Sequence, residues 1–229
     1  MKLRVGILGG TFDPIHKGHV YIARRVRQLF QLNQVLFMVA KTPPHKERHG
    51  ISQVFHRYAM VAIELLYEDD FYASRREIQK AGPSYTIETL QELEEQYPND
   101  EFLFIAGSDS LREIHLWKDY DKLLANHSMI FVQRPGAEVD LDSLSVPPEL
   151  KKRIKHLCPA KGPRTVEPGV SYLASLNAPS VSSTMLRKLI ANGGRVTDEQ
   201  VSPNVYQYIL KYRLYERNKG SAKQSLSGD

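Results

Sequence analysis

Two histidines spaced by three residues follow a pair of glycines near the start of the chain, in the segment G-G-T-F-D-P-I-H-K-G-H at residues 9–19. Glycine lets the backbone approach a phosphate closely, and the first turn of a helix offers unpaired N–H donors to an anion. Each imidazole could donate a hydrogen bond to a phosphate oxygen, and a nearby anion would favour its charged form. The segment therefore predicts a phosphate site that uses His16, His19, Gly9, Gly10, Thr11, Phe12 and Gly18.

The same segment differs from two common phosphate-binding loops. It contains neither the G-x-G-x-x-G pattern of dinucleotide-binding domains nor the G-x-x-x-x-G-K-[ST] pattern of P-loop enzymes. We therefore disfavour a dinucleotide-dependent oxidoreductase and a P-loop enzyme. A strand-to-helix turn with two incidental histidines is the simplest alternative, but their spacing directly after two glycines favours the phosphate site.

A second polar segment, S-S-T-M-L-R at residues 182–187, also lies at the predicted start of a helix. Ser182 is a good N-cap residue, while Ser183 and Thr184 place hydroxyl and N–H groups in the first turn. Arg187 follows Ser183 by four residues, so both lie on one face of the helix. These groups would form a second phosphate cradle with a guanidinium that can bind two oxygens. A well-capped surface helix with a solvated arginine explains the segment equally well.

Three shorter features add candidate ligands for a nucleotide. His45 and Lys46 follow two prolines and could meet phosphate, although a rigid surface loop accounts for them as well. Gly107 and Asp109 follow an apolar run, where the carboxylate could accept ribose hydroxyls or could cap a helix. Trp117 is the only tryptophan and could stack on a planar ring or pack in the core.

Apolar runs and helical patterns alternate along the chain. Short runs typical of buried strands occupy residues 3–8, 35–39, 101–106, 129–132 and 171–176. Apolar residues at helical spacing occupy 18–30, 54–67, 85–97, 111–114, 120–124, 183–191 and 203–215. The alternation predicts an α/β fold, in which a parallel sheet carries helices on both faces. Because each motif follows a strand, the motifs should meet at the carboxyl edge of the sheet, where ligands bind in such folds.

We expect one domain over residues 1–217. Residues 136–169 contain five prolines and read as an irregular insertion packed on that domain, with a polar helix at 148–156. Residues 218–229 are rich in glycine, serine and lysine, and this composition predicts a disordered tail.

Composition limits the class of protein. The 229 residues are 41% hydrophobic and 25% charged, which is typical of a globular domain. A net charge of +5 suits an anionic ligand, while the longest basic cluster, at residues 151–153, is too short to predict nucleic-acid binding. The sequence has no apolar run long enough to cross a membrane and no secretory signal pattern. With the single Cys158, these features predict a cytoplasmic protein without a nucleic-acid or membrane partner.

The segments together resemble a known superfamily. Residues 9–19 resemble the first signature of nucleotidyltransferases with the H-x-G-H motif, and residues 182–187 resemble the second. Within that superfamily, the chain most resembles the bacterial nicotinate-nucleotide adenylyltransferases. The other similar segments follow the family's order over nearly the whole chain: P-P-H-K at 43–46, S-Y-T at 84–86, G-S-D at 107–109, Trp117, R-P-G at 134–136 and V-Y-Q-Y-I-L-K-Y-R-L-Y at 205–215.

The resemblance implies a Rossmann-like fold and a reaction. In that reaction, AMP passes from ATP to nicotinate mononucleotide in the presence of Mg²⁺, which gives deamido-NAD and pyrophosphate. The Pro-rich residues 136–169 look longer than is usual in the family, so the contacts between subunits stay open. A homo-oligomer is compatible with the sequence.

The resemblance also implies roles for individual residues. The ATP phosphates would meet three catalytic residues, His16, His19 and Arg187. The other ATP contacts would come from Gly9, Gly10, Thr11, Phe12, Gly18, Gly107, Asp109, Ser182, Ser183 and Thr184. The mononucleotide would bind at His45, Lys46, Thr86, Trp117 and Arg134, with the nicotinate ring at Thr86 and Trp117.

Other functions stay open at this stage. Nicotinamide mononucleotide is the closest rival acceptor, because it carries a neutral amide in place of the carboxylate. Pantetheine-phosphate and glycerol-phosphate nucleotidyltransferases share the first signature, but the S-Y-T segment and Trp117 argue against them. A nucleotide-sensing or RNA-binding protein could reuse the fold without catalysis, although paired histidines together with Arg187 favour an enzyme.

Overall fold

The computed structural model describes residues 2–41, 51–134, 136, 138–157, 166–167 and 169–216. Within these residues, seven strands form one sheet in the order β3-β2-β1-β4-β5-β7-β6, and every neighbouring pair is parallel. The strands are β1 (Arg4–Gly10), β2 (Gln34–Val39), β3 (Phe71–Ser74), β4 (Glu101–Gly107), β5 (Ser128–Gln133), β6 (Ile154–Leu157) and β7 (Ser171–Ser175). The predicted α/β, Rossmann-like architecture is confirmed.

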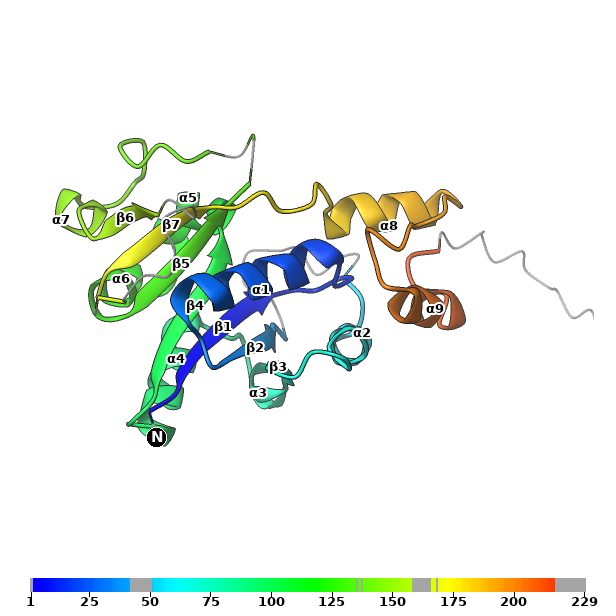
Figure 1. Cartoon of the computed structure of the whole chain (residues 1–229), viewed down its shortest axis with the longest axis horizontal. Helices are drawn as coiled ribbons and strands as arrows, with labels where there is room; N and C mark the ends of the chain where they lie inside the picture. The colour runs from blue at the N-terminus through cyan, green and yellow to red at the C-terminus, as the bar shows by residue number, and fades with distance from the viewer. Residues whose placement is uncertain are drawn as a thin grey trace, which may run out of the picture.

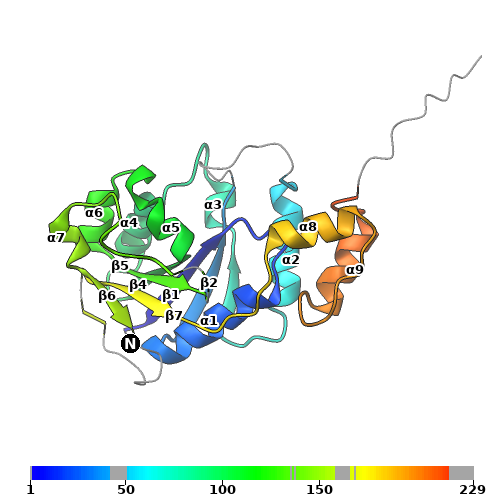
Figure 2. The same cartoon turned by 90° about the horizontal axis from the view of Figure 1, so that it is seen from above.

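Helices cover both faces of this sheet (Figures 1 and 2). They are α1 (Lys17–Phe30), α2 (Val54–Glu64), α3 (Arg76–Gln79), α4 (Thr86–Gln96), α5 (Ser108–Arg112), η1 (Ile114–Leu116), α6 (Tyr120–Asn126), α7 (Pro148–Lys151), α8 (Ser183–Ala191) and α9 (Pro203–Lys211). Figure 2 shows α1 on one face and α4, α5 and α6 on the other, with α2, α8 and α9 grouped at one end. No helix in the described part of the chain is long and apolar enough to cross a bilayer.

The central strands are buried on both faces, which explains why their sequences are continuous apolar runs. Successive residues of a strand point to opposite faces. Leu103 therefore packs in the core cluster that contains residues of α1, α2, α8 and α9, while Phe104 packs in the cluster that contains residues of α4, α5 and α6. The sheet separates two cores.

One predicted element in the Pro-rich stretch is wrong. A polar helix was expected over 148–156, but α7 ends at Lys151 and the chain then forms the edge strand β6. Ile154 and Leu157 are buried, and β6 pairs with β7 from Ile154↔Ser171 to Leu157↔Ala174. Helical periodicity cannot be distinguished from a short strand when only two buried residues are present. The predicted tail at 218–229 lies outside the described residues.

Two other boundaries also differ from the sequence predictions. The edge strand β3 was missed, because Phe71 is its only buried residue and four residues are too few to show an alternation. The last helix was expected over 203–215, but α9 ends at Lys211, and residues 212–215 form a turn. Arg213 and Tyr215 in that turn have positive φ angles of 51° and 69°, which a helix does not allow.

The strand order determines where a ligand can bind. From β1 the chain moves outward through β2 to β3, and it then returns to β4 on the other side of β1 and continues toward β5. Helices that leave β1 and β4 therefore depart to opposite faces and open a crevice at the carboxyl ends of these two strands.

Candidate functional site

A cavity of about 470 Å³ lies at the carboxyl ends of β1 and β4. Fifteen of the residues proposed above as site residues line it: Gly9, Gly10, Thr11, Phe12, His16, His19, Thr86, Gly107, Asp109, Trp117, Arg134, Ser182, Ser183, Thr184 and Arg187. The structure thus brings the two signature segments, the G-S-D segment and the S-Y-T segment to one place. His45 and Lys46 lie outside the described residues.

The first turns of α1 and α8 both contribute residues to this cavity, and Figure 1 shows the starts of the two helices near each other. Nη1 of Arg187 donates a 2.6 Å hydrogen bond to the carbonyl oxygen of Asp13, and Oγ of Ser183 donates one of 2.9 Å to the carbonyl oxygen of Pro14. Arg134 donates through Nη1 to the carbonyl oxygen of Val181, just before α8, at 3.0 Å. The start of α8 is therefore fixed against the turn that leads into α1.

Gly18 contributes to the site in a different way from the prediction. It does not line the cavity, although it was expected among the ATP contacts. A Cβ atom at this position would lie 3.0 Å from Nδ1 of His16 and 3.2 Å from Cγ1 of Val181. A larger residue here would fit tightly, because the imidazole and the segment before α8 both pack against the first turn of α1.

The two predicted histidines form a stacked pair. Their ring centroids are 3.7 Å apart with an interplanar angle of 22°, and His19 also packs edge-on against Phe12. The backbone N–H of His16 donates to Nδ1 of His19 at 3.2 Å. Since Nδ1 accepts this bond, a neutral His19 carries its proton on Nε2.

His16 is buried, with 1% of its surface exposed. Burial lowers the pKa of His16 from 6.5 to about 3, and the positive charge of Arg134 acts in the same direction. Without an anion, His16 is thus a neutral imidazole at neutral pH. An anion that favours the charged form, as the sequence suggested, must overcome both effects.

Part of the cavity lining is aromatic. Trp117 packs edge-on against Phe104, with ring centroids 6.0 Å apart, and also lines the cavity. It is half-buried, so packing and ring stacking are compatible functions of one side chain. Nζ of Lys118 lies 4.7 Å from the ring centroid of Tyr85, next to Thr86. The part of the cavity that Trp117 and Tyr85 line could receive a planar ring.

Sequence reasoning missed a buried arginine behind the site. Arg57, on α2, is 1% exposed and donates to four backbone carbonyl oxygens, those of Thr11, Ala40, Ser52 and Lys41, at 2.7, 2.8, 3.0 and 3.1 Å. It thereby ties the turn after β1 to the end of β2 and to the segment before α2. Since all four acceptors are backbone groups, no sequence pattern around them could have revealed the contact.

Glu77 is a second missed residue. Its carboxyl lines the cavity, is buried, and accepts a 3.1 Å hydrogen bond from Oγ1 of Thr89 on α4. Burial raises the pKa of Glu77, and the hydrogen bond from Thr89 opposes that rise. Glu77 follows β3, the strand that the sequence did not predict, so its place at the sheet edge could not be inferred.

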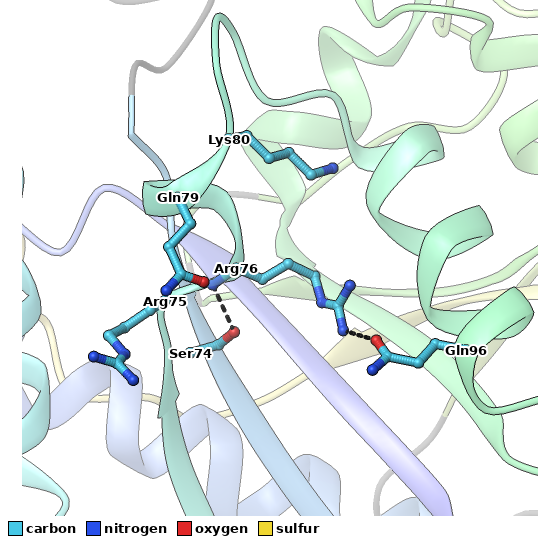
Figure 3. Close-up of a pocket in the computed structure, with 6 residues that line it drawn as sticks. All are labelled: Ser74, Arg75, Arg76, Gln79, Lys80 and Gln96. Atoms are coloured by element: carbon cyan, nitrogen blue, oxygen red, sulfur yellow. Dashed lines mark hydrogen bonds between the residues drawn. The ribbon is translucent and has the colours of Figure 1, made fainter.

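A separate cavity of about 550 Å³ shares no lining residue with the first. Figure 3 shows its residues: Ser74, Arg75, Arg76, Gln79, Lys80 and Gln96. Glu92 pairs with both Lys80, at 2.8 Å, and Arg76, at 3.8 Å. The positive charge of this second cavity is therefore partly balanced by Glu92. No residue proposed above as a site residue lines it.

The burial of His16 predicts a pH effect on stability. The folded pKa of about 3 lies below the ordinary 6.5, so the unfolded chain takes up a proton that the folded chain cannot. The contribution of His16 to the free energy of unfolding is therefore highest above pH 6.5. It falls by up to about 1.4 kcal/mol per pH unit between pH 6.5 and 3. We expect His16→Gln to flatten the decrease in unfolding free energy from pH 7 to 5, measured by urea titration. The exposed His156→Gln is the control, and equal slopes for wild type and His16→Gln would contradict the assignment.

Comparison with known proteins agrees with this geometry. The cytidylyltransferase-like family matches residues 7–189. The probable nicotinate-nucleotide adenylyltransferase of Syntrophotalea carbinolica is 36% identical over 219 residues, which cover 96% of this chain and 100% of the relative. That of Thermoanaerobacter sp. strain X514 is 35% identical over 218 residues, with 95% and 96% covered.

The fold has solved counterparts. The Plasmodium falciparum nicotinic acid mononucleotide adenylyltransferase complexed with NaAD superposes with a TM-score of 0.71 at 21% identity, covering 94% of this chain and 98% of that one. The same enzyme complexed with APC gives a TM-score of 0.69 at 20% identity, covering 93% and 97%. At such identities the likeness concerns the fold. From the family match and the sequence relatives, this chain belongs to the cytidylyltransferase-like family and, within it, to the nicotinate-nucleotide adenylyltransferases.

Proposed function

We propose that this protein transfers AMP from ATP to nicotinate mononucleotide, giving deamido-NAD and pyrophosphate in NAD biosynthesis. The observation that carries the proposal is the meeting of two helix starts, one with stacked histidines and one with Arg187, at a cavity that Trp117 also lines. Sequence relatives over nearly the full chain carry the name of this activity. A cavity that offers groups for phosphates together with an aromatic side chain for a planar ring suits a reaction that joins two nucleotides.

The ATP phosphates would bind where α1 and α8 begin. The positive ends of the two helix dipoles attract an anion there. His16 and His19 would donate hydrogen bonds to phosphate oxygens, and the guanidinium of Arg187, already fixed by the Asp13 carbonyl, would bind them as a cation. Gly107 and Asp109 would meet the ribose.

The mononucleotide would bind at the part of the cavity that Trp117 lines. Trp117 would stack on the nicotinate ring, and Thr86, at the first position of α4, would offer its backbone N–H to the ring carboxylate. Arg134, beside the start of α8, would attract the phosphate of the mononucleotide. We place His45 and Lys46 at the same phosphate on the basis of the sequence resemblance.

The proposed reaction is a direct in-line displacement. A phosphate oxygen of the mononucleotide attacks the α-phosphorus of ATP, the new P–O bond forms, and the bond to the bridging oxygen breaks with its electron pair on pyrophosphate. A phosphate monoester is already anionic at neutral pH, since its second pKa is about 6, so no general base is needed. The residues act by positioning and by stabilising the developing charge. No covalent intermediate on the enzyme forms.

Magnesium would enter as part of the substrate, as MgATP. In the described ranges, no group of three His, Cys, Asp or Glu side chains is arranged to hold a metal ion. Mg²⁺ commonly keeps several waters and is bound largely by substrate phosphates, so this site is compatible with it. Bound in that way, it would neutralise phosphate charge. A cytoplasmic location and a homo-oligomer remain predictions from the sequence.

A pyrophosphate-release assay with each acceptor tests the proposal. We expect turnover with ATP and nicotinate mononucleotide, and a kcat/KM about 100-fold or more below that value with nicotinamide mononucleotide, because donors that face the carboxylate would lose a charged partner. Equal kcat/KM values for the two acceptors would contradict the assigned substrate. Binding of ATP without turnover on any acceptor would favour a nucleotide-binding protein without catalysis.

His19→Ala tests the assigned mechanism. We expect kcat to fall about 100-fold or more with a much smaller change in KM for ATP, because the imidazole would act mainly on charge that develops in the transition state. The exposed His156→Ala should keep both constants. An unchanged kcat in His19→Ala would refute the assignment, and a nucleotidylated histidine trapped during turnover would refute direct displacement.

A further inference from the structure

The turn after α9 brings the end of the described chain back to the first signature. The hydroxyl of Tyr215 donates a 2.7 Å hydrogen bond to Oδ1 of Asp13, which is 202 positions earlier in the sequence. Arg213 and Tyr215 both have left-handed backbone angles, which are unfavourable for residues with a side chain. Such conformations persist where the surrounding structure determines them, and they often mark functional positions.

Asp13 connects three segments of the chain at the cavity. Its side chain is buried, with 1% exposed, and its Oδ2 accepts the N–H of Ser52 at 3.1 Å. Its carbonyl oxygen accepts the 2.6 Å bond from Arg187. Since Asp13 lies three residues before His16, a shift of its backbone would move the guanidinium and the first turn of α1 together.

We propose that Tyr215 is a positioning residue for the nucleotidyl transfer. Its hydroxyl fixes the side chain of Asp13 and thereby fixes the carbonyl that orients Arg187 and the turn that carries His16. The expected effect on the rate of transfer rests on the proposed function. The contact between Tyr215 and Asp13 rests on the structure alone. It gives a function to the C-terminal segment V-Y-Q-Y-I-L-K-Y-R-L-Y, which the sequence resemblance matched without a role.

The chemistry of the pair supports this arrangement. Burial raises the pKa of Tyr215, and the neighbouring negative charge of Asp13 raises it further, so the phenol keeps its proton and remains a donor. A buried carboxylate that loses a donor pays a desolvation cost and tends to reorient toward another one. The hydroxyl also interacts with the side chain of Ser52. Sδ of Met60, at 4.0 Å, is a weak acceptor.

Tyr215 also packs against the core cluster of α1, α2, α8 and α9, so a purely structural role must be distinguished. Tyr215→Phe keeps the ring and removes only the hydroxyl. Tyr208→Phe is the matched control. Tyr208 lies on α9, and the variant loses a 2.9 Å hydrogen bond to Nδ1 of His56 in place of the bond to Asp13. Both variants should be compared at a temperature where circular dichroism shows them fully folded.

We expect Tyr215→Phe to lower kcat about tenfold or more with little change in KM for ATP, because small displacements of positioned groups are costly for the reaction rate. Tyr208→Phe should keep the wild-type constants. Asp13→Asn should lower kcat as well, and adding it to Tyr215→Phe should cause less than the product of the two losses, as expected for residues that act together. Equal kcat values for Tyr215→Phe and Tyr208→Phe would overturn the proposal.

Hydrogen exchange without substrates separates this inference from the proposed reaction. We expect faster exchange of the amides at residues 13 and 15–19 and of the Ser52 amide in Tyr215→Phe than in Tyr208→Phe. If wild type turned over no acceptor, the proposed function would fail, and faster exchange would still support the positioning contact. Unchanged exchange at these amides would overturn it, whatever the activity.

Discussion

The site depends on the docking of α8 onto the backbone just before α1. Arg187 and Ser183 bond the carbonyl oxygens of Asp13 and Pro14, so one helix start is held directly against another. Side-chain donors that bind buried carbonyls are costly to leave unsatisfied, and this makes the contact well defined. As a result, two positive helix ends and a guanidinium converge on one cavity. An anionic ligand such as a triphosphate would complete this arrangement electrostatically.

Burial determines which groups carry the charge. His16 is held neutral by its surroundings, whereas Arg134 and Arg187 contribute guanidinium cations. Positive charge at the two helix starts therefore comes from Arg134, Arg187 and the helix ends, and His16 contributes as a neutral hydrogen-bonding group until an anion arrives. Arg57 supports this arrangement from behind, because its four bonds to backbone carbonyls hold the loops after β1 and β2 together.

The sequence predicted those parts of the molecule that depend on local pattern. Buried strands such as β1 and β4 are long apolar runs, and the two signatures stand directly after strands, so their meeting at one sheet edge follows from parallel topology. Short edge strands such as β3 and β6 contain too few buried residues to be recognised. Arg57 and Tyr215 could not be predicted, because their partners are backbone carbonyls or a residue 202 positions away. The neutral state of His16 is likewise a consequence of burial, which spacing does not reveal.

The central claim is that both helix starts bind one triphosphate. The most direct measurement is a crystal structure with a non-hydrolysable ATP analogue. The account predicts phosphate oxygens within hydrogen-bond distance of the His16–His19 pair and of Arg187 or the first turn of α8 in the same molecule. A triphosphate that contacts only one of the two helix starts, or that binds instead at the cavity of Arg75, Arg76 and Lys80, would contradict it.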